Sequence, residues 1–174
     1  QVTGEEFGRV AAGRIWDIEV EKQNAEFGWS PEASAVSEKA RRLARQAREA
    51  FNRKEYESAE RLFTECLSMS PVFATAHADY GDLLFRSGRL SDAETSYLRA
   101  LALEPDNPEY LARLGRLCMV MRGRASQAVL FLSRALEQRP QWTDLHLQLA
   151  QSLRVTGDLI GALSHVNTYL SRAG

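Results

Sequence analysis

The sequence has only two cysteines and no apolar run of the length that a membrane span requires. A transmembrane helix needs about 20 consecutive apolar residues, and no basic region followed by an apolar one opens the chain, so we expect no membrane span and see no signal peptide. Cys66 and Cys118 lack the pair spacing of zinc or redox motifs. We expect both to be small apolar core residues, which agrees with a reducing compartment without establishing one.

Lysine is also scarce, because 19 of the 22 basic residues are arginine. Arginine is suited to planar, bidentate pairing with carboxylates, although genome base composition produces the same bias. The net charge of -1 conceals an asymmetry: residues 1–38 hold eight acidic and three basic side chains, and residues 39–174 hold fifteen and nineteen. The sequence therefore predicts an acidic front segment joined to a basic body. Since the chain begins with Gln1 rather than Met, we expect a processed form or part of a longer protein.

The acidic front segment has two competing periodicities. In "RIWDIEVEK", residues 14–22, apolar and acidic residues alternate as in a β-strand. A helical spacing also runs through the same region, carried by Phe7, Val10, Ala11, Ile15 and Ile18. Glycines and Pro31 argue against one long helix. We expect residues 1–36 to be an irregular extension, which either caps the first repeat or occupies a groove of the body.

The body contains an internal repeat of 34 to 35 residues. Its marker positions form three series: Ala59, Ala93, Ala128 and Ala162; Ala47, Gly81, Gly115 and Ala150; and Pro71, Pro105 and Pro140. Small residues let antiparallel helices approach closely, and the residue before a proline is driven out of the helical region. Each repeat is therefore predicted to be a helical hairpin, and one extra residue is placed in the turn "MRGRAS".

Turn chemistry supports the hairpins. Gly88 and Gly157 stand where a helix C-terminus needs a left-handed residue. Asp106 or Asn107 is predicted to cap the following helix, with Pro108 in its first turn.

At these residues the chain resembles the tetratricopeptide repeat (TPR) family. Residues 74–107 match the family's pattern best, with Gly81, Ala93, Tyr97, Ala100 and Pro105 in its marker positions. The resemblance implies an all-α, right-handed solenoid of antiparallel helix pairs, whose first helices line a concave groove. The domain spans residues 37–174, with repeats at about 40–73, 74–107, 108–142 and 143–174. The first repeat departs most, with Gln46 and Ala50 where large apolar residues are usual.

No catalytic constellation is apparent, so we expect a protein without enzymatic activity or cofactor. His77 and His146 occupy equivalent positions in the second and fourth repeats, and we interpret both as packing residues. One intervening repeat separates them, which is too far for a shared zinc ion. Cys66 and Cys118 are similarly distant, so neither a disulfide nor a thiolate metal site is expected. The glycine-containing turns match no nucleotide-binding fingerprint.

The resemblance also implies a set of groove residues on the first helix of each repeat. By position these are Arg41, Arg45, Arg48, Asp79, Asp82, Phe85, Arg86, Arg113, Arg116, Met119, Gln148, Gln151 and Arg154, with Thr75, Glu109 and Asp144 beside them. The set is net basic, with an acidic island at Asp79 and Asp82. The alternative is an ordinary solvated set of helix faces.

Two ligand modes known in the family are not supported. The places of the Lys and Asn clamp for an acidic chaperone tail hold Ala44, Arg48, Asp79, Glu109 and Arg113, and the places of an asparagine ladder hold Arg45, Asp79, Arg113 and Gln148. What remains is an extended or helical peptide with acidic residues, with Phe85 and Met119 as apolar contacts.

We therefore interpret the chain as a scaffold that binds an acidic or mixed-charge peptide of a protein partner. Self-association through the acidic front segment, or through the apolar last helix with Leu163, Val166, Tyr169 and Leu170, is a second expectation. Further repeats or a partner would cover that last helix. Nucleic-acid binding through the arginines is the less favoured alternative, because carboxylates interrupt the stripe and the net charge is near zero. A regulatory region of a larger enzyme is a third.

Overall fold

The computed structural model describes residues 37–173. Residues 1–36 and residue 174 lie outside the described part, and so does every prediction for the acidic front segment. Within residues 37–173 every regular element is an α-helix, which confirms the predicted fold class. Across the same range, no helix combines the length and the apolarity that a membrane span requires.

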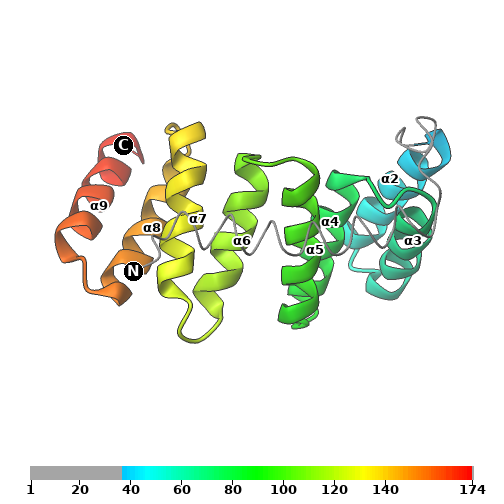
Figure 1. The fold of residues 1–174 in the computed structure, drawn as a ribbon, viewed down its shortest axis with the longest axis horizontal. Helices are drawn as coiled ribbons and strands as arrows, with labels where there is room; N and C mark the ends of the chain where they lie inside the picture. The colour runs from blue at the N-terminus through cyan, green and yellow to red at the C-terminus, as the bar shows by residue number, and fades with distance from the viewer. Residues whose placement is uncertain (1–36, 174) are drawn as a thin grey trace. The chain divides into compact units, whose positions relative to one another are not determined.

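The described helices form four consecutive hairpins, each with two antiparallel helices side by side (Figure 1). In chain order the helices are α2 (Glu38–Asn52), α3 (Tyr56–Met69), α4 (Ala74–Arg86), α5 (Leu90–Leu103), α6 (Pro108–Val120), α7 (Ala125–Gln138), α8 (Thr143–Thr156) and α9 (Leu159–Ala173). The α6–α7 connection is one residue longer than the α4–α5 connection. This is the turn in which the repeat spacing places an extra residue.

Helix ends follow the predicted turn chemistry. Gly88 and Gly157 both have positive φ, at 76° and 91°, so the left-handed conformation expected of them is confirmed. Asn107 caps α6, because its side chain accepts a hydrogen bond of 3.0 Å from the backbone N–H of Glu109. Asp106 instead accepts a hydrogen bond from the Arg134 guanidinium. Of the two candidates for this cap, the structure selects Asn107.

The chain divides between Glu104 and Pro105 into two compact units. The N-terminal unit contains α2 to α5, and one of its core clusters gathers Ala47, Ala59, Phe63 and Leu83. The C-terminal unit contains α6 to α9, with Leu111, Leu114, Leu117 and Leu132 among its fully buried side chains. Burying each such side chain stabilises a fold by about 1.5–3 kcal/mol.

Two glycines set how closely the helices of a hairpin approach. A Cβ atom added at Gly81 would lie 2.5 Å from Cε1 of Tyr97 on α5, and one at Gly115 would lie 2.6 Å from Cδ2 of Leu132 on α7. Since a carbon atom needs about 3.5–4.0 Å from its neighbour, no larger residue is accommodated without a shift. The close helix approach predicted from the small-residue series is confirmed at both positions.

Both cysteines are thiols rather than disulfides and both are fully buried, as their expected role in the core requires. The Cys66 thiol donates a hydrogen bond of 3.2 Å to the carbonyl oxygen of Ala40. Burial raises the pKa of the Cys66 thiol to about 11. Since the thiolate is the reactive form, Cys66 is a poor nucleophile near neutral pH.

Histidine packing differs in one respect from the sequence-based interpretation. His77 and His146 are both buried, and each imidazole Nε2 lies within hydrogen-bond distance of a proline carbonyl six residues earlier, Pro71 at 2.8 Å and Pro140 at 3.1 Å. In addition, Nδ1 of His146 lies 2.9 Å from Nδ1 of His165 on α9. That contact holds only one proton, so the pair joins α8 to α9 when at least one imidazole is neutral.

These histidines should make stability depend on pH. Burial lowers the pKa of His77 and of His165 below the ordinary value of 6.5, helped by positive charge at Arg99 and at His146 respectively. Below that pH the unfolded chain binds more protons than the folded chain, so the free energy of unfolding falls as pH falls. Above it, both states are neutral and the effect vanishes.

We expect the thermal midpoint of the chain to drop between pH 7.5 and pH 5. The variant His77→Leu should show a smaller drop, because leucine occupies the equivalent positions 43 and 111 and does not titrate. Melting curves followed by circular dichroism across this range measure both slopes. Equal slopes for the two proteins would contradict the role given to His77.

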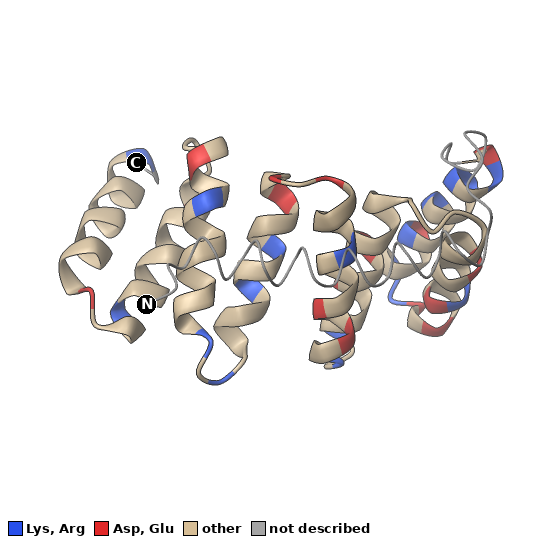
Figure 2. Cartoon of the chain, viewed as in Figure 1, with Lys and Arg blue, Asp and Glu red and all other residues tan. Residues whose placement is uncertain are grey.

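Helix α9 ends the described chain with an apolar side that no described element covers. Leu159, Ile160, Leu163 and Leu170 are all exposed, with Ile160 at 87%. Arg172 is the one charged residue within α9, which accounts for its nearly uncoloured ribbon in Figure 2. That further repeats or a partner cover this side stays a prediction.

Candidate functional site

The arginines of α2 lie on one exposed side of the N-terminal unit. Arg41, Arg45 and Arg48 follow the i, i+4, i+7 spacing of a single helix face. Arg41 and Arg45 lie 3.8 and 3.6 Å from the carboxylate of Glu38, in exposed ion pairs. Such pairs contribute about 0–1 kcal/mol, so both guanidinium groups can exchange this partner for a ligand.

Arg48 has a different environment. Its Nε donates a hydrogen bond of 2.9 Å to Oδ2 of Asp79 on α4, and Nη2 donates to the same oxygen. Asp79 is only 8% exposed. The guanidinium of Arg48 neutralises the charge of Asp79 inside the N-terminal unit. Arg48 therefore has an intramolecular partner and is less available to a ligand than Arg41 and Arg45.

The second acidic groove residue predicted on α4 also has a contact within the N-terminal unit. Asp82 accepts a hydrogen bond of 2.7 Å from the Tyr97 hydroxyl. Phe85 is half-buried and Arg86 is exposed. The acidic island expected at Asp79 and Asp82 is therefore not a free acidic surface, because both carboxylates serve contacts between helices.

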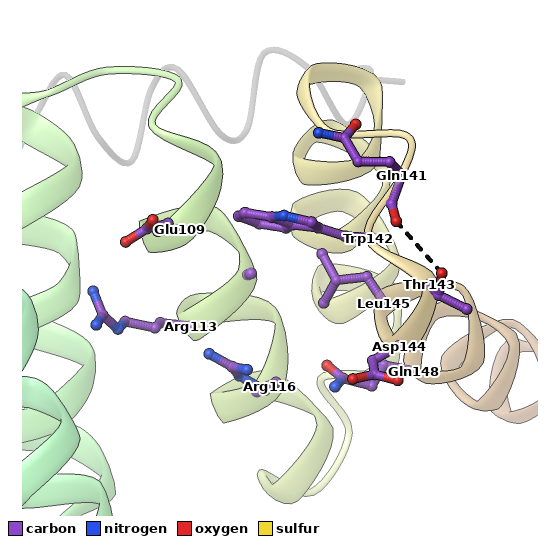
Figure 3. A pocket seen from close by; sticks show the side chains of 10 residues that line it. Glu109, Arg113, Arg116, Gln141, Trp142, Thr143, Asp144, Leu145 and Gln148 are labelled. Atoms are coloured by element: carbon purple, nitrogen blue, oxygen red, sulfur yellow. Dashed lines mark hydrogen bonds between the residues drawn. The ribbon is translucent and has the colours of Figure 1, made fainter. Parts of the chain in front are cut away.

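In the C-terminal unit, α6 and the start of α8 enclose a hollow with a volume of about 490 Å³ (Figure 3). We call it the α6/α8 hollow. It is lined by Glu109, Ala112, Arg113, Arg116, Gln141, Trp142, Thr143, Asp144, Leu145 and Gln148. Three predicted groove residues, Arg113, Arg116 and Gln148, therefore line one concave site.

Charge in the α6/α8 hollow is mixed, with a basic centre. The residues Glu109, Arg113 and Arg116 share one face of α6, and the guanidinium of Arg113 also lies over the Tyr110 ring at 5.9 Å. Arg116 is exposed and has no acidic partner among residues 37–173. Asp144 faces the hollow from α8 (Figure 3). A ligand with carboxylates at its centre and polar or basic groups beside them would complement this order.

Trp142 provides the large apolar surface of the hollow and is not among the residues predicted from the sequence. It is the residue before α8, and its ring reaches toward α6 beside Glu109 (Figure 3). Arg139 lies over the same ring, at 5.8 Å from its centroid. The sequence does contain a hint of this role, because the equivalent residue before α4 is also aromatic, Phe73. The family's groove positions all lie within helices, so neither residue is included in the predicted groove set.

The remaining groove residues of the C-terminal unit do not line the α6/α8 hollow. Met119, Gln151 and Arg154 line a second hollow, of about 690 Å³, at the end of α6 and the second half of α8. One predicted stripe is thus divided between two concave sites of different composition.

Within residues 37–173, no group of three or more His, Cys, Asp or Glu side chains could hold a metal ion. The side chains that line the α6/α8 hollow provide guanidinium, carboxylate, amide and indole groups, which can form hydrogen bonds, ion pairs and apolar contacts with a ligand.

Comparison with known proteins gives matches over most of this chain. A family model described as "Cilia and flagella-associated protein 70 middle TPR-like domain" matches residues 40–162. The Homo sapiens protein "Tetratricopeptide repeat protein 16" is 32% identical over an alignment of 96 residues, which covers 52% of this chain and 11% of that protein. This chain therefore spans about a tenth of the length of that curated relative.

Solved structures with a similar fold include two that are described as TPR proteins. MamA has a TM-score of 0.72 at 15% identity, over 77% of this chain and 78% of its own. YrrB, "a TPR protein with an unusual peptide-binding site", has a TM-score of 0.69 at 22% identity, over 75% and 66%. The first TPR of Spaghetti (RPAP3), bound to the HSP90 peptide SRMEEVD, has a TM-score of 0.67 at 19% identity, over 71% and 98%. At such identities these likenesses establish the fold alone, and they confirm the resemblance found in the sequence.

Proposed function

Because this chain belongs to the cilia and flagella-associated protein 70 middle TPR-like family, we propose that it is a non-enzymatic scaffold that binds a peptide segment of a partner protein. The α6/α8 hollow is the binding site, and the ligand is acidic or mixed in charge. The observation that carries the proposal is the position of Arg113 and Arg116 in a concave site beside the Trp142 ring. Two proteins of the same fold, YrrB and RPAP3, are described with peptide sites or peptides.

The physical basis is a division of roles within the hollow. Two arginines on adjacent turns of α6 offer planar donors that suit carboxylates. The half-buried ring of Trp142 offers an apolar surface to a neighbouring side chain, whereas Ala112 and Leu145, at 3% and 5% exposure, add little to it. Oε1 of Gln148 is buried without a hydrogen-bond partner among the described residues. Once the side chain turns toward the hollow, a peptide N–H would satisfy a group that otherwise costs about 1–3 kcal/mol.

Charge reversal in the hollow should weaken binding of an acidic peptide. As a probe we choose the fluorescein-labelled peptide Glu-Asp-Leu-Asp-Glu-Glu, titrated by fluorescence anisotropy. We expect the variant Arg113→Glu/Arg116→Glu to bind at least about tenfold more weakly than the natural sequence, a loss of about 1.4 kcal/mol. The affinity should also fall with added salt.

The matched control is Arg42→Glu/Arg53→Glu, which makes the same change of charge on exposed residues of the N-terminal unit outside the predicted groove set. It should retain affinity within about twofold, a difference of about 0.4 kcal/mol. Equal weakening in both variants would mean that net charge, rather than the α6/α8 hollow, controls binding. The proposed site would then be abandoned.

The acidic front segment is the first natural ligand to test. The alternative is that this segment caps the first repeat, which would require an apolar surface on α2. The exposed residues Arg42, Gln46 and Glu49 of α2 are polar and provide little of it. A synthetic peptide of residues 1–34 should compete with the acidic probe if the chain recognises its own front segment. Absence of competition would assign the hollow to a different protein.

A further inference from the structure

The second hollow of the C-terminal unit has a composition of its own. We call it the turn hollow. It has a volume of about 690 Å³ and is formed by the end of α6, the α6–α7 turn and the second half of α8. It shares no lining residue with the α6/α8 hollow.

Exposed apolar side chains gather in the turn hollow. Val120 at the end of α6 is 55% exposed and Val155 on α8 is 67% exposed, and both line it. Met119 and Met121 line it as well. Scattered exposed valines are ordinary on a protein surface, but apolar residues gathered in a concave site indicate a binding surface. Methionine is flexible and polarisable, so its side chains adjust to different apolar groups.

The charge of the turn hollow has one sign. Its lining contains Arg122 and Arg154 and no aspartate or glutamate. Both arginines are exposed, and neither has an acidic partner among residues 37–173. Arg124, the third arginine of this region, is held by Gln127 and by Sδ of Met121 at 3.4 Å. Two available guanidinium groups therefore flank the apolar lining, a complement to a ligand with carboxylates beside an apolar side chain.

We propose that the turn hollow is a second docking site, for a partner segment in which one or two large apolar side chains are flanked by Asp or Glu. The site is independent of the α6/α8 hollow and shares with it only the class of ligand. A concave site of this size accepts inserted side chains, whereas binding to an anionic membrane surface favours a protruding apolar and basic element. The shape therefore favours a peptide over a lipid surface.

The test uses the full chain with Arg113→Glu/Arg116→Glu as background, so that the α6/α8 hollow does not contribute. The probe is the fluorescein-labelled peptide Asp-Glu-Leu-Trp-Glu-Asp, titrated by fluorescence anisotropy. Adding Val155→Asp should weaken binding by about tenfold or more, because it places a carboxylate on the apolar lining among the acidic groups of the ligand. Adding Arg154→Glu should weaken it by about three- to tenfold, since it reverses one flanking charge.

Matched control variants distinguish an effect on the turn hollow from a general effect of the added charge. Ile160→Asp changes an apolar residue outside the hollow that is even more exposed than Val155, and Arg42→Glu reverses an exposed arginine of the N-terminal unit. Both should leave the affinity within about twofold. Replacing Leu and Trp of the probe with serine should abolish binding, because the apolar anchor is then missing. Circular dichroism of the Val155→Asp protein confirms its fold.

The inference is overturned if the peptide binds the background protein as tightly with Val155→Asp as without it, or does not bind at all. It is also overturned if the background binds vesicles of phosphatidylserine and phosphatidylcholine but not the peptide. A negative result for the turn hollow would not count against the α6/α8 hollow. That site is tested separately, by the affinity for the acidic probe that Arg113→Glu/Arg116→Glu removes. The two results are thus distinguishable.

Discussion

Replacing Gly115 with valine is expected to unfold the C-terminal unit at temperatures at which the natural chain remains folded. A Cβ at position 115 would lie 2.6 Å from both Cγ and Cδ2 of Leu132. Leu132 is fully buried, so it cannot move aside into solvent, and the backbone nitrogen of the same residue lies 3.4 Å away. Overpacking of this kind costs about 1–3 kcal/mol. We expect the upper end of that range, which for a unit of this size corresponds to a thermal midpoint lower by roughly 12–24 °C.

A double-mutant cycle distinguishes this clash from a general intolerance of substitution. Gly115→Ala introduces the same Cβ, although alanine gains about 1 kcal/mol of helix propensity over glycine. Leu132→Ala alone leaves a cavity and costs about 2–5 kcal/mol. If the clash is with Leu132, the double variant Gly115→Ala/Leu132→Ala is more stable than the sum of the single changes, by about 1 kcal/mol or more. Additive effects in thermal or urea unfolding would show that Leu132 is not the obstacle.

The hairpins could be predicted from the sequence because their determinants are local or repeat at a fixed spacing. Gly88 and Gly157 are required by the backbone conformation at a helix end, and Asn107 by the unpaired N–H groups of the next helix. Gly81 and Gly115 recur because the same close approach is built in each hairpin. Each of these determinants can be identified from residue type and position alone.

The candidate site was predictable only in part, since its form depends on contacts between repeats. Asp79 belongs to an exposed stripe by position, but Arg48, 31 residues earlier, pairs with it and leaves it buried. Trp142 lies just before a helix, outside the stripe that the family pattern defines. Val120 and Val155 are ordinary as single residues and become a surface only where the end of α6 and α8 meet. No spacing within one repeat contains this information.

Loss of the Arg48 side chain should destabilise the N-terminal unit through the carboxylate that it leaves behind. In Arg48→Met, Asp79, which is 8% exposed in the natural sequence, loses both N–H donors of the guanidinium. Removing one partner of a fully buried pair costs about 3–5 kcal/mol. Since the Arg48 side chain is 53% exposed, water reaches the pair, and we expect about 1–3 kcal/mol. Urea unfolding at pH 7 measures the difference.

The rescue variant is Arg48→Met/Asp79→Asn, in which the buried group is neutral and no longer needs a cation. We expect it to recover most of the stability lost in Arg48→Met, whereas a double variant as unstable as the single one would mean that packing of the Arg48 stem is what matters. Because the pair is committed within the N-terminal unit, Arg48→Met should leave the affinity for the acidic probe unchanged. A tenfold loss of affinity, about 1.4 kcal/mol, would instead return Arg48 to the binding surface and place the acidic ligand on α2.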